Sequence, residues 1–131
     1  MKNLIIVICG LSLTASGQVK YAFTNFAGGA SGSGNGTSNG ASFNQPFSLT
    51  RDSHGNLFVS DYNNHTIREI TPAAVVTTFA GTAPSAGTND GTGAAARFYG
   101  PDGIVADSAD NLYLFAIITT TRSGRSRREG T

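Results

Sequence analysis

Part of the chain repeats itself after 55 residues. Without a gap, "FNQPFSLTRDSHGNLF" at residues 43–58 aligns with "FYGPDGIVADSADNLY" at residues 98–113. A repeat of this length is typical of architectures that stack one small unit, so it limits the fold more than any other feature of the sequence. Six of the sixteen pairs are identical: Phe43/Phe98, Pro46/Pro101, Asp52/Asp107, Ser53/Ser108, Asn56/Asn111 and Leu57/Leu112.

The repeated unit has the pattern of a small antiparallel sheet. Four short runs at residues 47–51, 56–60, 66–70 and 75–81 are rich in β-branched and aromatic residues, with Asp, Asn, Gly and Pro between them. No stretch of about ten or more residues has the apolar spacing of a helix. Four antiparallel strands joined by tight turns make one propeller blade, so the predicted fold class is an all-β propeller.

The residues between the runs predict particular turns. In "DSHGN" we expect Asp52 to accept hydrogen bonds from the following backbone amides and Gly55 to take a positive φ. The second copy has Asp110 in the place of the glycine, and aspartate tolerates that conformation less well. Pro72 has a fixed φ and no N–H, which favours a turn over a central strand.

A single strand is predicted ahead of the first complete unit. "AFTNFAG" at residues 22–28 aligns with "VVTTFAG" at residues 75–81, so it corresponds to an outermost strand with no blade before it. In a closed propeller such a strand commonly completes the last blade. The 17 glycines cluster at residues 28–40 and 81–93, which indicates loops on either side of the complete unit.

These patterns resemble the NHL repeat, and the chain is similar to the N-terminal part of an exported bacterial NHL-repeat protein. The family implies a propeller that typically has six blades, of which this chain supplies one lone outer strand, one full blade and half of a second. Repeat residues in that family are largely structural, so the resemblance implies architecture rather than chemistry. The matching residues are Pro46, Asp52, Gly55, Asn56, Leu57, Asp61, Asn64, Thr66, Ile67, Arg68 and Ile70, and in the second copy Pro101, Gly103, Ile104, Asp107, Asn111, Leu112 and Tyr113.

Residues 1–17, "MKNLIIVICGLSLTASG", are typical of a secretory signal peptide: one Lys, an apolar run, then small residues. The alternatives are a buried strand or helix and a membrane anchor, but the run has about half of the roughly 20 residues that a membrane span needs. Cys9 lies inside the run, so we expect no lipid anchor. The prediction is a secreted, periplasmic or cell-envelope protein of a bacterium, with no membrane attachment after cleavage.

The repeat stops abruptly after Leu112, where "NLYLFAIITTTRSGRSRREGT" replaces the expected continuation. Codons permitted for "AIITTTRSGRSRREG" contain, one base out of phase, a reading of DYNNHTIRKVTPGG. This matches residues 61–68 and the following Thr-Pro turn, and the first two bases of each codon are largely dictated by the residues present. We therefore predict a frameshift between about Tyr113 and Ala116, with residues 116–131 as its product.

The frameshift changes how the charge of the chain is interpreted. The formal charge is +1, but four of the nine basic residues lie in the last ten positions and Lys2 lies in the predicted signal peptide. The intervening part carries four basic and seven acidic side chains, a net of −3. This composition excludes a nucleic-acid footprint, and we expect no selected function for the basic tail.

Candidate site residues are few, and none is predicted to be catalytic. His65 beside Asp61 suggests a metal ligand, although a turn or strand-end role is favoured. We expect Arg68 to pair with an acid on a neighbouring blade, with substrate contact as the alternative.

Calcium binding is left open by five aspartates, but "DSHGN" and "DSADN" have too few alternating oxygen ligands for a dedicated calcium loop. The five are Asp52, Asp61, Asp90, Asp107 and Asp110. The binding candidates are Asp61, Asn64, His65 and Arg68.

The function predicted on this basis is an exported binding or interaction scaffold for a protein or carbohydrate ligand. The alternative is a piece of a metal-dependent lactonase- or lyase-like six-bladed propeller enzyme. Uncovered blade edges also suggest self-association. The predicted segments are the signal peptide 1–17, lone strand 18–28, Gly/Ser-rich loop 29–42, complete blade 43–81, Gly/Ala-rich loop 82–97, half-blade 98–115 and frameshifted tail 116–131.

Overall fold

The computed structural model describes residues 6–13 and 19–115, with side chains from residue 24 onward. Strands dominate these residues, and the helical segments among them are three short 3-10 turns. None of these turns approaches the length or apolar character of a transmembrane helix. The predicted signal peptide and the predicted frameshifted tail lie largely or wholly outside the described residues.

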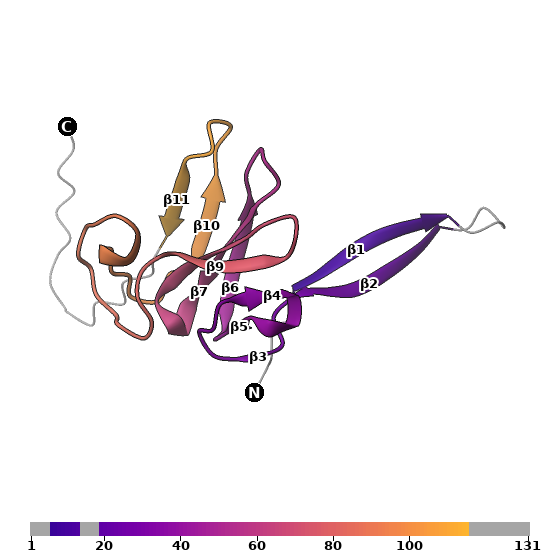
Figure 1. The fold of residues 1–131 in the computed structure, drawn as a ribbon. Coiled ribbons are helices and arrows are strands. Elements are labelled where there is room, and N and C mark those ends of the chain that lie inside the picture. Colours follow the sequence, from indigo (N-terminus) through magenta and orange to yellow (C-terminus); the bar gives the residue numbers. More distant parts are fainter. Residues whose placement is uncertain (1–5, 14–18, 116–131) are drawn as a thin grey trace, which may run out of the picture.

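The complete unit forms an antiparallel blade, as the repeat predicts (Figure 1). Neighbouring strands along the chain pair in turn, so the sheet runs from the inner strand to the outer strand without a crossover. A short strand of the first Gly-rich loop adds a fifth member at the outer edge. In spatial order the strands are β6 (Pro46–Arg51), β7 (Leu57–Asp61), β8 (Thr66–Ile70), β9 (Val75–Ala80) and β4 (Gly36–Thr37).

The second unit is half a blade. It consists of β10 (Gly103–Ala106) and β11 (Leu112–Phe115), paired antiparallel with Ile104 opposite Leu114. β10 lies against β6 of the complete blade (Figure 1). The described residues therefore form part of a propeller whose ring is not closed.

The lone strand has a different partner from the one that the repeat suggests. It spans β2 (Val19–Ala27) and pairs antiparallel with β1 (Ile6–Leu13), the apolar run of the predicted signal peptide. This hairpin projects away from the blades (Figure 1). Among the described residues, β1 is the strand that satisfies the backbone groups of β2.

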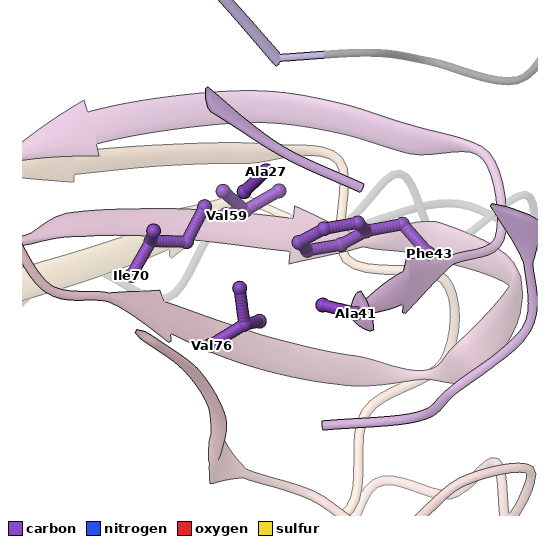
Figure 2. Close-up of a cluster of buried hydrophobic side chains, with 6 residues drawn as sticks. All are labelled: Ala27, Ala41, Phe43, Val59, Ile70 and Val76. Atoms are coloured by element: carbon purple, nitrogen blue, oxygen red, sulfur yellow. The ribbon is translucent and has the colours of Figure 1, made fainter. Parts of the chain in front are cut away.

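The first Gly-rich loop folds over one face of the blade. Its parts are β3 (Ala30–Ser31), the 3-10 turn η1 (Ser38–Gly40) and β5 (Ser42–Phe43), with β3 and β5 paired in parallel. The loop and the blade enclose an apolar core between them (Figure 2). This core consists of Ala27, Ala41, Phe43, Val59, Ile70 and Val76.

A second apolar cluster joins the two blades. Phe58 and Ile67 of the complete blade pack against Ile104 of the half-blade. Equivalent positions of the repeat differ in exposure, because in the described part of the chain blades meet at this one junction. Ile104 is 2% exposed and its counterpart Leu49 is 51% exposed, whereas Phe58 is 6% exposed and its counterpart Tyr113 is 52% exposed. On the other face of the complete blade, the first Gly-rich loop covers Val59, Ile70 and Val76 but leaves Leu49 exposed. On the half-blade, Tyr113 is exposed where a further blade would pack.

The predicted turn chemistry is confirmed. Asp52 Oδ1 accepts from the amides of His54 at 3.0 Å and Asn56 at 2.7 Å. Gly55 has a φ of 90°, and Asp110, its counterpart in the second unit, has a φ of 63°. Pro72 lies in the turn between β8 and β9.

Substitution of Gly55 by alanine is expected to destabilise the chain by about 1–3 kcal/mol, because an L-residue is strained at its φ of 90°. Gly40 is the matched control: it lies outside the positive-φ region, and no atom lies within 4 Å of a Cβ built there. Gly40→Ala is expected to be neutral or slightly stabilising. Urea unfolding of both variants checks the difference, and equal losses would contradict it.

Candidate binding site

Three polar side chains of the complete blade meet on the face that the first Gly-rich loop covers. Asp61 ends β7, Asn64 lies in the 3-10 turn η2 (Tyr62–Asn64) and Arg68 is the central residue of β8. Arg68 Nη1 and Asn64 Nδ2 both donate to Asp61 Oδ2, at 3.0 and 2.6 Å. The side chains of Asp61 and Arg68 are 0% exposed. We call these three residues the polar cluster.

The strand register explains why these side chains meet. Arg68 lies opposite Val59 in the β7–β8 pair, and Asp61 follows Val59 by two residues. The side chains of Arg68 and Asp61 therefore lie on the same face of the sheet. η2 then turns the chain so that Asn64 reaches back to Asp61. The predicted pairing of Arg68 with an acid on a neighbouring blade is wrong: an acid on the adjacent strand is within closer reach.

The polar cluster holds the first Gly-rich loop. The guanidinium of Arg68 donates to two loop carbonyls and one side-chain oxygen, and Asn64 donates to a third carbonyl. A planar group with several fixed donors suits such a set of acceptors. The acceptors are Ser42 O at 2.9 Å, Gly34 O at 2.9 Å, Asn35 Oδ1 at 2.9 Å and Gly32 O at 2.7 Å.

The electrostatics of the cluster are internally compensated. Burial raises the pKa of Asp61, while hydrogen bonds from Asn64, the Asn44 amide and Arg68 act in the opposite direction. The Arg68 guanidinium also lies 5.0 Å from the centroid of the Phe43 ring, a cation–π distance. Charges that are paired and enclosed in this way stabilise local structure and are not presented to a ligand.

His65 lies apart from the polar cluster. It has a left-handed backbone conformation, with φ at 56°, and caps the end of η2. Its Nδ1 accepts from the amide of Gly100 at 3.1 Å, and its ring stacks on Tyr99 with centroids 5.8 Å apart. His65 therefore links the complete blade to the segment that leads into the half-blade.

Aromatic rings gather around Gly100 beside His65. Tyr62 lies so close that a Cβ added at Gly100 would be 2.8 Å from its ring, and Tyr62 in turn contacts Phe47 with centroids 6.1 Å apart. Phe47 is 69% exposed and Tyr99 is 65% exposed. We call Phe47, Tyr62, His65 and Tyr99 the aromatic strip. Exposed rings that lie together are a common feature of interaction surfaces.

Four of the five aspartates that leave calcium binding open serve in turns or in the polar cluster. Asp52 and Asp107 accept from amides of their own turns, and Asp110 accepts from both Ser53 N and Ser53 Oγ, at 2.8 and 2.7 Å. His54 Nδ1 lies 3.3 Å from Asp110 Oδ2. In the part of the chain that the structure describes, no three His, Cys, Asp or Glu residues are grouped as a metal site would require.

The four candidates from the sequence thus separate into two groups. Asp61, Asn64 and Arg68 come together beneath the first Gly-rich loop. His65 instead belongs to the aromatic strip, where its ring stacks on Tyr99. The sequence analysis missed Phe47, Tyr62 and Tyr99. The sequence signal for them is the position of each aromatic residue, which is at a turn or beside a proline. An aromatic side chain at such a position is not needed for the core.

Comparisons with known proteins identify similar folds. No protein-family model matches the chain, and no curated protein matches it. Crystal structures do match, including a protein of unknown function from Bacteroides thetaiotaomicron at 25% identity with a TM-score of 0.62. An auxiliary nutrient binding protein of that species matches at 25% identity with a TM-score of 0.63, and a putative phosphatase from it at 23% with a TM-score of 0.71.

These matches relate the chain to a part of longer proteins. They cover 79%, 82% and 86% of this chain, but only 26%, 29% and 28% of the three solved chains. The chain therefore spans less than a third of the structures that it resembles.

Proposed function

We propose that this chain is the N-terminal part of an exported bacterial NHL-type propeller that acts as a binding scaffold. The observation that carries this proposal is the enclosure of the polar repeat residues. Asp61 and Arg68 are fully buried and satisfy each other, so they support the blade instead of reacting with a substrate. The aromatic strip is then the surface that the described residues offer to a ligand.

A carbohydrate is the ligand class that we propose for this surface. Phe47 and Tyr99 offer exposed flat rings, while the hydroxyl of Tyr62 and the ring of His65 add polar atoms close by. Rings of this kind combine a large apolar contact area with a polar edge, which suits a ligand that has apolar faces and hydroxyl groups. The similarity to an auxiliary nutrient binding protein supports binding, and the predicted signal peptide supports an envelope or extracellular location.

Affinity electrophoresis in gels that contain soluble polysaccharides tests the binding proposal. The chain is expected to be retarded by at least one polysaccharide, and Tyr99→Ser is expected to weaken that retardation about tenfold, as loss of a central aromatic contact does. Val75→Ser is the matched control, because Val75 is an exposed apolar residue at the other side of the blade. Retardation that neither variant changes would place binding elsewhere, and no retardation by any polysaccharide would contradict the proposal.

The enzyme alternative predicts a different result. A lactonase- or lyase-like propeller holds a metal ion on its central axis with ligands from several blades, so the frame-corrected product would retain calcium or zinc in stoichiometric amount. Elemental analysis after gel filtration measures this directly. Retention of either metal would favour the enzyme over the scaffold.

A further inference from the structure

Three hydroxyl side chains of the complete blade bond to the backbone of β10 and of the residue before it. Because their partners are backbone groups, these contacts depend on the edge of a strand and not on its side chains. We call Ser48, Thr50 and Ser60 the hydroxyl row. The bonds are from Ile104 N to Ser48 Oγ at 3.5 Å, from Ala106 N to Thr50 Oγ1 at 3.0 Å and from Ser60 Oγ to Asp102 O at 2.7 Å.

The strand register places the hydroxyl row on one face of the complete blade. Ser48 lies opposite Ser60 in the β6–β7 pair, and Thr50 follows Ser48 by two residues, so the three side chains share a face. Among the described residues, β10 pairs with β11 alone, so its other edge presents backbone amides. An amide that a neighbouring blade covers needs an acceptor, and the hydroxyl row supplies it.

A carboxylate joins the two blades at the turns beyond these strands. Asp110, in the turn between β10 and β11, accepts from Ser53 N at 2.8 Å and from Ser53 Oγ at 2.7 Å. These bonds hold the pKa of Asp110 below its usual value. His54 Nδ1 lies 3.3 Å from Asp110 Oδ2, but the His54 side chain is 76% exposed, so the bonds from Ser53 are the main contact.

Asp110 stands at a position that favours glycine. Its φ is 63°, and its repeat counterpart Gly55 has a φ of 90°. Glycine adopts a positive φ without the strain that an L-residue has there, although aspartate is one of the more tolerant residues. The two bonds with Ser53 offset this strain, and a glycine has no side chain with which to make them.

The half-blade does not repeat this arrangement for a blade that would follow it. Ser108 is the counterpart of Ser53, but the counterparts of the hydroxyl row have no hydroxyl groups. The hydrogen bonds between the two blades are therefore specific to this junction and are not a property of every pair of repeats. The counterparts are Gly103 for Ser48, Val105 for Thr50 and Phe115 for Ser60.

We propose that the hydroxyl row is a docking surface for the inner strand of the second blade, and that an acid in the left-handed position of the following turn identifies the correct strand. Asp110 supplies this selectivity, because the first blade has Gly55 at the equivalent position. A second copy of the chain that presented its first blade to the hydroxyl row would lack both bonds to Ser53, and so would be disfavoured. No residue of the aromatic strip takes part, so this docking and polysaccharide binding are tested separately.

Replacement of Asp110 by glycine is a sharp test, because the backbone and the side chain predict opposite results. Glycine relieves the strained φ, so a residue that served its own turn alone would leave the half-blade unchanged or more stable. We expect instead that the Ala106 amide, which bonds to Thr50, exchanges at least about tenfold faster in Asp110→Gly than in the parent chain. Unchanged or slower exchange would overturn the proposal.

Two serine variants are the matched controls, since they make the same substitution at equivalent positions of the repeat. Ser53→Ala is expected to speed exchange at Ala106, because it removes one of the bonds to Asp110. Ser108→Ala changes an exposed residue of the half-blade's own turn and is expected to leave the rate unchanged. Equal rates in the two serine variants would contradict the docking role.

Two further measurements separate the junction from general stability. The effects of Ser53→Ala and Asp110→Gly are expected not to add in the double variant, because both remove the same contact. The Thr71 amide, which bonds to Val75 O within the complete blade, is expected to exchange at the parent rate in every variant. Additive effects, or equal acceleration at Thr71, would count against a contact that acts at the junction.

Discussion

Replacement of Arg68 by alanine is expected to lower the free energy of unfolding by about 3–5 kcal/mol, because it leaves the buried Asp61 carboxylate without its partner. The loss also frees the first Gly-rich loop, since three of the hydrogen bonds of Arg68 end on that loop. Urea unfolding followed by circular dichroism measures the loss. A drop of this size is a large fraction of the stability of an ordinary domain, so the urea midpoint of the variant is expected to fall well below that of the parent chain.

Two further variants separate charge from geometry. Arg68→Lys keeps a positive charge but lacks the planar fork, so it is expected to recover only part of the loss. Glu69→Ala changes the next residue of β8, which is not part of the polar cluster, and is expected to change stability little. An Arg68→Ala effect no larger than that of Glu69→Ala would contradict the structural role of the cluster.

The cost of Arg68→Ala is expected to depend on pH. Burial raises the pKa of Asp61 in the folded state, and Arg68 opposes that rise, so its removal raises this pKa further. The folded variant then binds a proton at a pH where the unfolded chain has released it. Its stability relative to the parent chain therefore improves as pH falls through the raised pKa, and the loss is largest at neutral pH. Unfolding curves at several pH values check this trend.

Replacement of Ile104 by alanine is expected to cost about 2–5 kcal/mol, because its side chain fills the junction between the blades. Leu49 occupies the same position of the repeat but lies on an uncovered face, so Leu49→Ala is expected to cost less than about 0.5 kcal/mol. The same kind of truncation at equivalent positions thus gives different results, and the difference measures the cover that a neighbouring blade supplies. Comparable losses for the two variants would contradict a serial stack of blades.

The uncovered faces also have a consequence in solution. Leu49 on one side, and Tyr113 and Phe115 on the other, are large apolar side chains that a complete ring would cover. A head-to-tail contact between copies of the chain would bury them in the way that Ile104 is buried. Self-association through these faces remains a prediction of both the sequence and the structure.

The sequence determined the fold class, because the repeat, the alternating apolar residues and the turn residues are local signals that do not depend on distant contacts. It correctly placed the strands of the complete blade, the carboxylate-capped turn at Asp52 and the positive φ at Gly55. It also named Asp61, Asn64 and Arg68 among its candidates, since they match the NHL-repeat pattern.

Only the tertiary structure decided what those residues do. The partner of Arg68 depends on which face of β8 the side chain occupies, and that follows from the strand register and not from the spacing alone. The pairing of β2 with β1 and the aromatic strip depend likewise on segments that meet in space. Local chemistry fixes strands and turns, whereas a binding surface exists only where distant parts of the chain come together.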